Sequence, residues 1–176
     1  MQGRKLLHGG DYNPEQWLDR PDILEQDIEL MKKARVNTVT LGVFSWSVLE
    51  PEEGVFNLDW LADIIHNLYA NGIRTILATP SAARPAWLAH KYPEVRRVRA
   101  DRVRELYNRR QNYCYTSSIY REKVRAIDQK LAQRLGMIRQ SSFGTSPTRW
   151  AGTATAHCVR RSSATGCRHG TERWRR

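Results

Sequence analysis

The first 136 residues alternate between short apolar or β-branched runs and longer segments with helical periodicity, and the rest of the chain shows neither pattern. Strands separated by helices predict β-α-β units, which build a parallel sheet because each crossover returns the chain to the same end of the sheet. Either a barrel or a doubly wound sheet can begin in this way. No G-x-G-x-x-G motif follows a predicted strand, which counts against a dinucleotide-binding fold.

The pattern predicts three strands, at residues 6–12, 36–44 and 73–80. In the second strand, Val39, Leu41 and Val43 alternate with threonine and glycine. This alternation is typical of a barrel strand, with one face under helices and the other toward the interior.

Apolar residues at helical spacing follow each predicted strand. One helix is expected to begin at Pro21, and a second to end at Asn71 and Gly72, which both tolerate a left-handed backbone. Ser118 is predicted to cap a third helix, which ends at Gly136. The apolar stripe of this third helix comprises Tyr120, Val124, Ile127, Leu131 and Leu135.

The composition divides the chain into residues 1–136 and residues 137–176. The formal net charge is +11, and the second part contributes +7 of it, from eight arginines and a single acid, Glu172. This part contains no leucine and has no apolar stripe. It cannot bury enough apolar surface to offset the entropy of ordering it, so we expect a disordered basic tail.

Several classes of protein are disfavoured by the sequence. No apolar run approaches the roughly 20 residues of a membrane span, and the first residues lack the apolar region of a secretory signal. The three cysteines, Cys114, Cys158 and Cys167, are odd in number and widely spaced, so they predict no disulfide framework. We therefore expect a cytoplasmic protein without a membrane partner.

Aromatic and arginine side chains gather where the predicted strands end, which in a (β/α)₈ barrel is the catalytic face. GGDYNPEQW follows the first strand, VFSW the second, and TP the third, with RRQNYC further along the same loop. Flat rings suit the C–H faces of sugars, and guanidinium groups donate to hydroxyls.

These stretches closely resemble glycoside hydrolase family 42, a family of β-galactosidases. The matching motifs are GGDYNPEQW, VNTVTLGVFSW with LEPEEG, TPSAARPAWL with YPEV, and RRQNYC with SSIYREK. They occur in family order across residues 6–136. The resemblance implies an α/β fold, the first three β/α units of a (β/α)₈ TIM barrel, since a whole barrel takes about 250 residues.

The resemblance also implies roles for individual residues. Arg110 matches the arginine that binds the galactose unit, and Cys114 matches the first of four zinc-binding cysteines, the others lying in a C-x-C-x₂-C cluster. Two glutamates, in an Asn-Glu pair ending strand four and at the end of strand seven, would cleave terminal β-D-galactosides with retention in a full-length, homo-oligomeric enzyme. Neither has a counterpart here, so we predict no catalytic residue in this chain and no activity.

Other interpretations of the same residues stay open. Cys114 alone is more often a small buried apolar residue than a ligand. Glu15 and Glu50 are tempting carboxylates, but Glu50 lies in a Pro/Gly turn and retention needs two carboxyl groups about 5–5.5 Å apart. Trp17 and Trp46 suit barrel packing and sugar platforms equally well.

A shift of reading frame would explain the break at residue 137. Synonymous codons can be chosen for the whole tail such that the neighbouring reading frame encodes an apolar strand, an Asn-Glu pair and a C-x-C-x₂-C cluster. These features follow one another in family order. A leucine-free run rich in Arg, Ser, Thr, Ala and Gly is also typical of GC-rich DNA read out of frame. We interpret residues 137–176 as out of frame, with one base lost near the Gly136 codon.

The basic charge supports one rival function, a small nucleic-acid-binding protein. It would use the tail and the arginines of one loop, which are Arg96, Arg97, Arg99, Arg102, Arg104, Arg109 and Arg110. Asp101, Glu105 and the ordered family motifs argue against it, so no specific nucleic-acid partner is expected.

Overall fold

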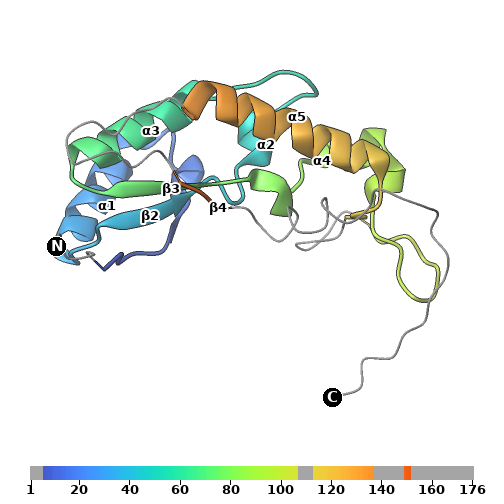
Figure 1. Ribbon diagram of the computed structural model, residues 1–176, viewed down its shortest axis with the longest axis horizontal. Helices are drawn as coiled ribbons and strands as arrows, with labels where there is room; N and C mark the ends of the chain where they lie inside the picture. The colour runs from blue at the N-terminus through green and yellow to red at the C-terminus, as the bar shows by residue number, and fades with distance from the viewer. Residues whose placement is uncertain (1–5, 107–112, 137–148, 152–176) are drawn as a thin grey trace, which may run out of the picture.

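The computed structural model describes residues 6–106, 113–136 and 149–151, which form a parallel sheet with helices packed against it (Figure 1). The strands are β1 (Asp11–Tyr12), β2 (Thr38–Leu41), β3 (Arg74–Ala78) and β4 (Arg149–Ala151). They lie side by side in chain order, and each neighbouring pair is parallel. The predicted α/β class with a parallel sheet is therefore confirmed.

Helices occupy every connection between the first three strands, and they also follow β3. The α-helices are α1 (Pro21–Lys33) after β1, α2 (Trp46–Leu49) and α3 (Asp59–Ala70) after β2, and α4 (Ala86–Lys91) and α5 (Ser118–Leu135) after β3. Single 3₁₀ turns are η1 (Pro14–Gln16), η2 (Pro80–Ala82) and η3 (Pro93–Val95). The short helices α2 and α4 were not predicted, because four to six residues are too few to show a helical period.

The prediction that Ser118 caps the third helix is wrong by one residue. Ser117 has an extended backbone and its hydroxyl accepts a 3.3 Å hydrogen bond from the Tyr120 backbone N–H. An N-cap residue needs this non-helical conformation to reach an unpaired amide of the first turn. Ser118 is instead the first helical residue.

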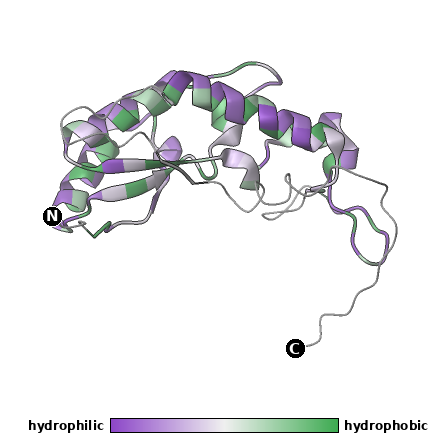
Figure 2. Ribbon diagram, viewed as in Figure 1, coloured by the Kyte–Doolittle hydropathy of each residue, from purple (hydrophilic) through white to green (hydrophobic). Residues whose placement is uncertain are grey.

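One face of the sheet carries the core. Val39, Leu41 and Leu77 are almost fully buried, and they belong to the same cluster as apolar side chains of α1, α3 and α5. Figure 2 shows apolar and polar bands alternating along these helices, as expected for amphipathic helices with one face packed against a core. Thr40 and Ile76 are partners across β2 and β3, and both are only half-buried. By the alternation of a strand, they belong to the opposite face.

The edge strand β1 is shorter than predicted, although the backbone contact with β2 begins before it. His8 O accepts from the N–H groups of Asn37 and Thr38, and Gly10 O accepts from Thr40. A Cβ atom at Gly9 would lie 1.7 Å from Thr38 O, so only glycine fits this approach.

A fourth strand lies within the range for which a disordered tail was predicted. β4 pairs with β3 in the register Ile76–Arg149, Leu77–Trp150 and Ala78–Ala151. α5 returns the chain along the sheet, where β3 offers unpaired backbone groups, and backbone pairing makes little demand on side-chain type. The other residues of 137–176 lie outside the described ranges. Among the described helices, none has the length and apolarity needed to cross a membrane.

Candidate functional site

Parallel pairing brings the carboxyl ends of the strands to one edge of the sheet. Tyr12 pairs with Leu41, and Leu41 pairs with Leu77, so these three residues form a row across β1, β2 and β3. The segments that follow this row carry Asn13, Ser45 and Thr79. In parallel α/β folds this edge is where ligands bind.

Three polar side chains beyond β1 and β2 have atoms that water does not reach. Asn13 Oδ1, Glu15 Oε2 and Ser45 Oγ are all buried. Asn13 Oδ1 and Glu15 Oε2 have no hydrogen-bond partner within the described residues. Burial raises the pKa of Glu15 above its ordinary value, although its own backbone and the nearby Ser45 hydroxyl act in the opposite direction. A buried oxygen without a partner is costly, so this corner is suited to receive hydrogen-bond donors.

Glu50 has a structural environment. Its side chain is buried, and its carboxylate accepts hydrogen bonds from Trp46 Nε1 at 2.7 Å and from the Gly54 backbone N–H at 2.9 Å. The Glu50 carbonyl oxygen accepts a third, from Trp87 Nε1 at 2.9 Å. This carboxylate holds the turn between α2 and α3 together, and the prediction that Glu50 is not catalytic stays a prediction.

The two tryptophans that the sequence left equivalent have different environments. Trp46 is completely buried, with its ring centroid 6.3 Å from that of Tyr120, so it serves packing. Trp17 follows η1 at the carboxyl end of β1 and is 42% exposed. Only Trp17 of this pair keeps a surface that a sugar ring could cover.

Aromatic rings also pack together on either side of Cys114, the residue predicted to bind metal. Tyr113 stacks on Tyr120 with centroids 4.5 Å apart, and Tyr115 meets the Tyr113 ring edge-on. The Tyr120 hydroxyl donates a 2.7 Å hydrogen bond to Ser81 O, just beyond β3. Cys114 lies within this packed segment, and its backbone N–H donates to Val95 O at 2.8 Å.

The Cys114 thiol is set up to ionise more readily than usual. Burial raises its pKa, but hydrogen bonds from Thr116 and from the Ser117 backbone N–H, with the charge of Arg104, outweigh that effect and lower the pKa overall. Thr116 Oγ1 lies 3.1 Å from Cys114 Sγ. A thiolate is the form in which cysteine binds a metal ion.

Comparisons with known proteins show the family of this chain. The family model of the glycoside hydrolase family 42 β-galactosidases matches residues 11–140. The chain belongs to glycoside hydrolase family 42. Among family members, it is 62% identical over 131 residues to β-galactosidase GalA of Bacillus licheniformis and 60% identical over 131 residues to β-galactosidase GanA of Bacillus subtilis. Each alignment covers 74% of this chain and 20% of the relative.

A solved family 42 structure has the same arrangement. Gan42B, a β-galactosidase from G. stearothermophilus, superposes with a TM-score of 0.78 and 55% identity. The match covers 86% of this chain and 21% of Gan42B. The chain thus spans about a fifth of the length of the family 42 proteins that it matches.

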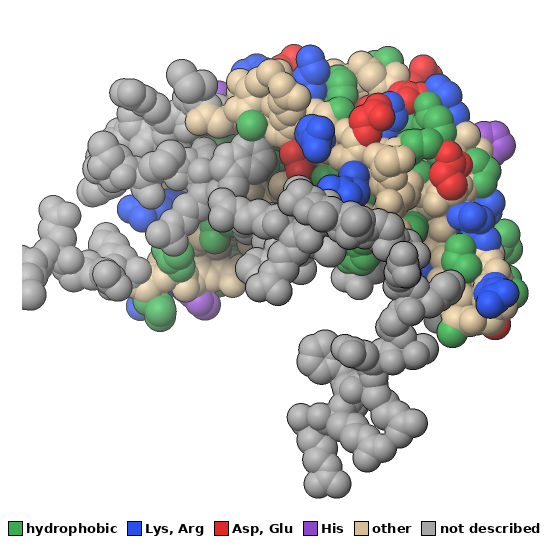
Figure 3. Space-filling view, turned by 45° about the vertical axis from the view of Figure 1, so that its right-hand side comes forward, with side chains coloured by type: hydrophobic (Ala, Val, Ile, Leu, Met, Phe, Trp, Pro, Cys, Tyr) green, Lys and Arg blue, Asp and Glu red, His purple; other side chains and the backbone are tan. Residues whose placement is uncertain are grey.

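Two arginines of the basic loop make contacts within the protein. Arg99 pairs with Asp101 at 2.9 Å, and Arg104 donates to the carbonyl oxygens of Pro93 and Arg96. Figure 3 shows acidic and basic side chains interspersed on one face of the molecule. Membership of family 42 does not favour the nucleic-acid-binding alternative.

The roles of the two predicted ligand residues, Arg110 and Cys114, both stay predictions. Arg110 lies outside the described residues, so its role stays a prediction. A structural zinc site needs four ligands, and within the described ranges no group of three or more His, Cys, Asp or Glu side chains assembles. A thiol such as that of Cys114 is a chemical type that binds zinc, but the described residues do not make a complete site.

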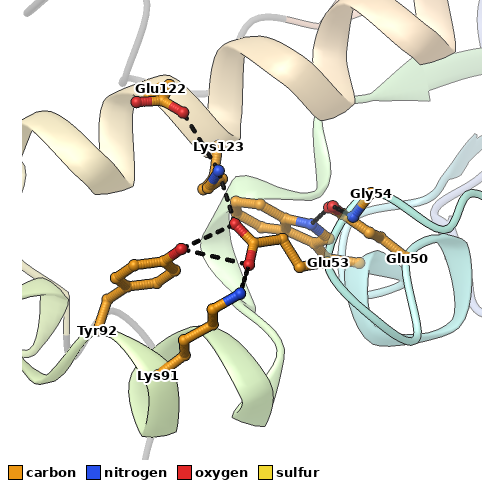
Figure 4. Close-up of polar contacts among 8 residues, drawn as sticks. Glu50, Glu53, Gly54, Lys91, Tyr92, Glu122 and Lys123 are labelled. Carbon is orange, nitrogen blue, oxygen red and sulfur yellow. Dashed lines mark hydrogen bonds and ion pairs between the residues drawn. The ribbon is translucent and has the colours of Figure 1, made fainter.

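Sequence reasoning missed one polar cluster near this edge. Glu53 accepts hydrogen bonds from Lys91 and Tyr92 at the end of α4 and from Lys123 of α5 (Figure 4). No local sequence pattern predicts contacts between residues so far apart in the chain. The nearby hydrogen bond between Trp46 and Glu50 could have been predicted from sequence spacing. The two residues are four positions apart, the spacing at which helical side chains meet.

Proposed function

We propose that residues 1–136 supply the first β/α units of a retaining β-galactosidase that acts on terminal β-D-galactosides. Membership of family 42 carries this proposal, and the parallel sheet with polar groups at its carboxyl edge supports it. The sheet would close into a (β/α)₈ barrel with further strands, and Thr40 and Ile76 would then face its interior.

The proposed chemistry uses two carboxyl groups. A protonated glutamate gives its proton to the leaving oxygen while a second glutamate attacks the sugar, and water then releases the product. The resemblance puts these glutamates at the ends of strands four and seven, and this sequence contains neither motif. We therefore expect the 176-residue chain alone to be inactive.

Residues of this chain would contribute binding. Arg110 would donate to the galactose hydroxyls, the corner of Asn13 and Glu15 would face the pocket, and Trp17 would offer an aromatic surface at its rim. Cys114 would bind zinc together with cysteines from elsewhere. Zinc would then brace the loop, and we assign it no part in the reaction.

We further propose that residues 137–176 are read out of frame. The codons permit a neighbouring frame with an Asn-Glu pair and a C-x-C-x₂-C cluster. Sequencing the gene around codon 136 tests this directly. Restoring one base should open a frame with both motifs, and a neighbouring frame without them would overturn the interpretation.

A chimera tests the proposed function. It joins residues 1–136 of this chain to the part of Bacillus licheniformis GalA beyond the matched region, a junction supported by 62% identity. We expect the chimera to hydrolyse a chromogenic β-galactoside, whereas the 176-residue chain should not exceed a blank. A chimera that folds but does not turn over substrate would contradict the proposal. We expect the complete enzyme to be cytoplasmic and homo-oligomeric.

A further inference from the structure

Glu53 forms the centre of a charged cluster at the carboxyl edge of the sheet (Figure 4). Its carboxylate pairs with Lys91 and, at 2.7 Å, with Lys123 Nζ. The Tyr92 hydroxyl donates to the same carboxylate, at 3.0 Å from Oε1 and 3.2 Å from Oε2. Both lysines also lie within 6 Å of the Tyr92 ring, which favours a cation above its face.

This cluster differs from an ordinary surface ion pair. The Glu53 side chain is 23% exposed and that of Lys123 only 18%, so solvent screens the pair incompletely. Hydrogen bonds from Lys123 and then Lys91 lower the pKa of Glu53 to about 2. A network of several charges around one carboxylate contributes more than an isolated exposed pair does.

The cluster joins three segments that are distant in sequence. Glu53 lies in the connection between α2 and α3, Lys91 ends α4, and Lys123 lies on α5. A second contact supports the first, because Trp87 of α4 donates to the Glu50 carbonyl in the same connection. α4 is therefore held at both of its ends to the loop that follows β2.

The end of α4 in turn holds the base of the long loop that follows β3. Val95 N–H donates to Tyr92 O at 3.0 Å, and Cys114 N–H donates to Val95 O at 2.8 Å. Arg96 and Tyr113 form an antiparallel bridge beside this contact. Tyr92 therefore links the Glu53 cluster to both sides of the loop where it leaves and rejoins the body of the protein.

We propose that Glu53 is a positioning residue for galactoside hydrolysis, because it fixes α4 and the Val95–Cys114 contact at the base of the long loop that follows β3. The inference rests on the proposed function. In this role Glu53 touches no substrate and acts through Tyr92.

Asp59 provides a matched control. It forms an ion pair with Arg134 at 2.9 Å, which also fastens the α2–α3 region to α5, but at the opposite end of α5. Asp59→Ala removes one acid and one tie to the same helix, and it leaves α4 untouched. Glu53→Gln is the conservative variant, because its amide oxygen can still accept from Tyr92 or a lysine.

Hydrogen exchange on the 176-residue chain tests the structural step. Glu53→Ala should speed exchange in peptides covering 86–96 and 113–118 by about tenfold or more, and Asp59→Ala should not. Unchanged exchange in these peptides, equal changes in both variants, or no protection there in the unmodified chain would each overturn the inference.

Kinetics of the GalA chimera test the functional step. At a temperature where all variants are folded, Glu53→Ala should lower kcat/KM by about tenfold, since small misplacements of substrate-binding groups are costly. Glu53→Gln should recover part of this loss, and Asp59→Ala should stay within about twofold. An active chimera whose kcat/KM is unchanged by Glu53→Ala would refute the positioning role. An inactive parent chimera would instead refute the proposed function.

Discussion

Replacing Glu50 with alanine should destabilise the fold because two donors lose their acceptor, and one of them, Trp46 Nε1, is buried. Trp46 Nε1 and the Gly54 backbone N–H both donate to this carboxylate, at 2.7 and 2.9 Å, and Trp46 is completely buried. A hydrogen bond to a charged group contributes about 1.5–3 kcal/mol. Partial relaxation of the turn and entry of water recover some of the two-bond total, so we expect a loss of about 2–4 kcal/mol.

Urea unfolding of the GalA chimera, followed by tryptophan fluorescence, measures this loss. Glu52→Ala is the control, since Glu52 is the exposed neighbour and should change the unfolding free energy by less than about 0.5 kcal/mol. Glu50→Gln should also destabilise, because its amide can accept only one of the two donors, yet the folded variant should keep its turnover. The reasoning fails if Glu50→Ala leaves stability unchanged, or if Glu50→Gln abolishes turnover without loss of stability.

Three further predictions concern other contacts. Tyr120→Phe should cost about 1–3 kcal/mol in urea unfolding, because Ser81 O loses a buried 2.7 Å donor; a neutral result would show that this oxygen finds another partner. Trp17→Ala in the chimera should raise KM for a galactoside at least severalfold and leave the urea midpoint almost unchanged, and the reverse pattern would assign Trp17 to packing. The Glu53 ion pairs should stabilise the fold fully above the ordinary carboxyl pKa of 4.5 and lose this effect as the pH falls toward about 2. The melting temperatures of the wild type and Glu53→Ala should therefore converge over that pH range. A constant difference between the two melting temperatures would contradict this prediction.

The fold was predictable where the signal is local. Leu61, Ile65 and Leu68 repeat at helical spacing, and α3 buries all three. The alternation of Val39 and Leu41 with threonine likewise identified β2 and its buried face. β4 was not predictable, because its pairing uses backbone groups and the position to which α5 returns the chain, and neither leaves a mark in side-chain sequence.

The position of the candidate site follows from the order of the strands, but its contacts do not. The carboxyl ends of parallel strands meet at one edge, so Asn13 and Ser45 could be placed there in advance. Trp46 is buried and Trp17 is exposed, and this difference depends on tertiary packing. The residue type, which the two share, does not reveal it. The Glu53 cluster joins residues up to 70 positions apart, and a sequence carries no local sign of such a contact.

Turnover by the GalA chimera is the most direct measurement of the central claim, that residues 1–136 are working barrel units of a family 42 β-galactosidase. The chimera should release the chromophore from a β-galactoside at a rate near that of intact Bacillus licheniformis GalA, and the isolated 176-residue chain should release none above a blank. A soluble, folded chimera without turnover, or an isolated chain that turns over substrate, would contradict the claim.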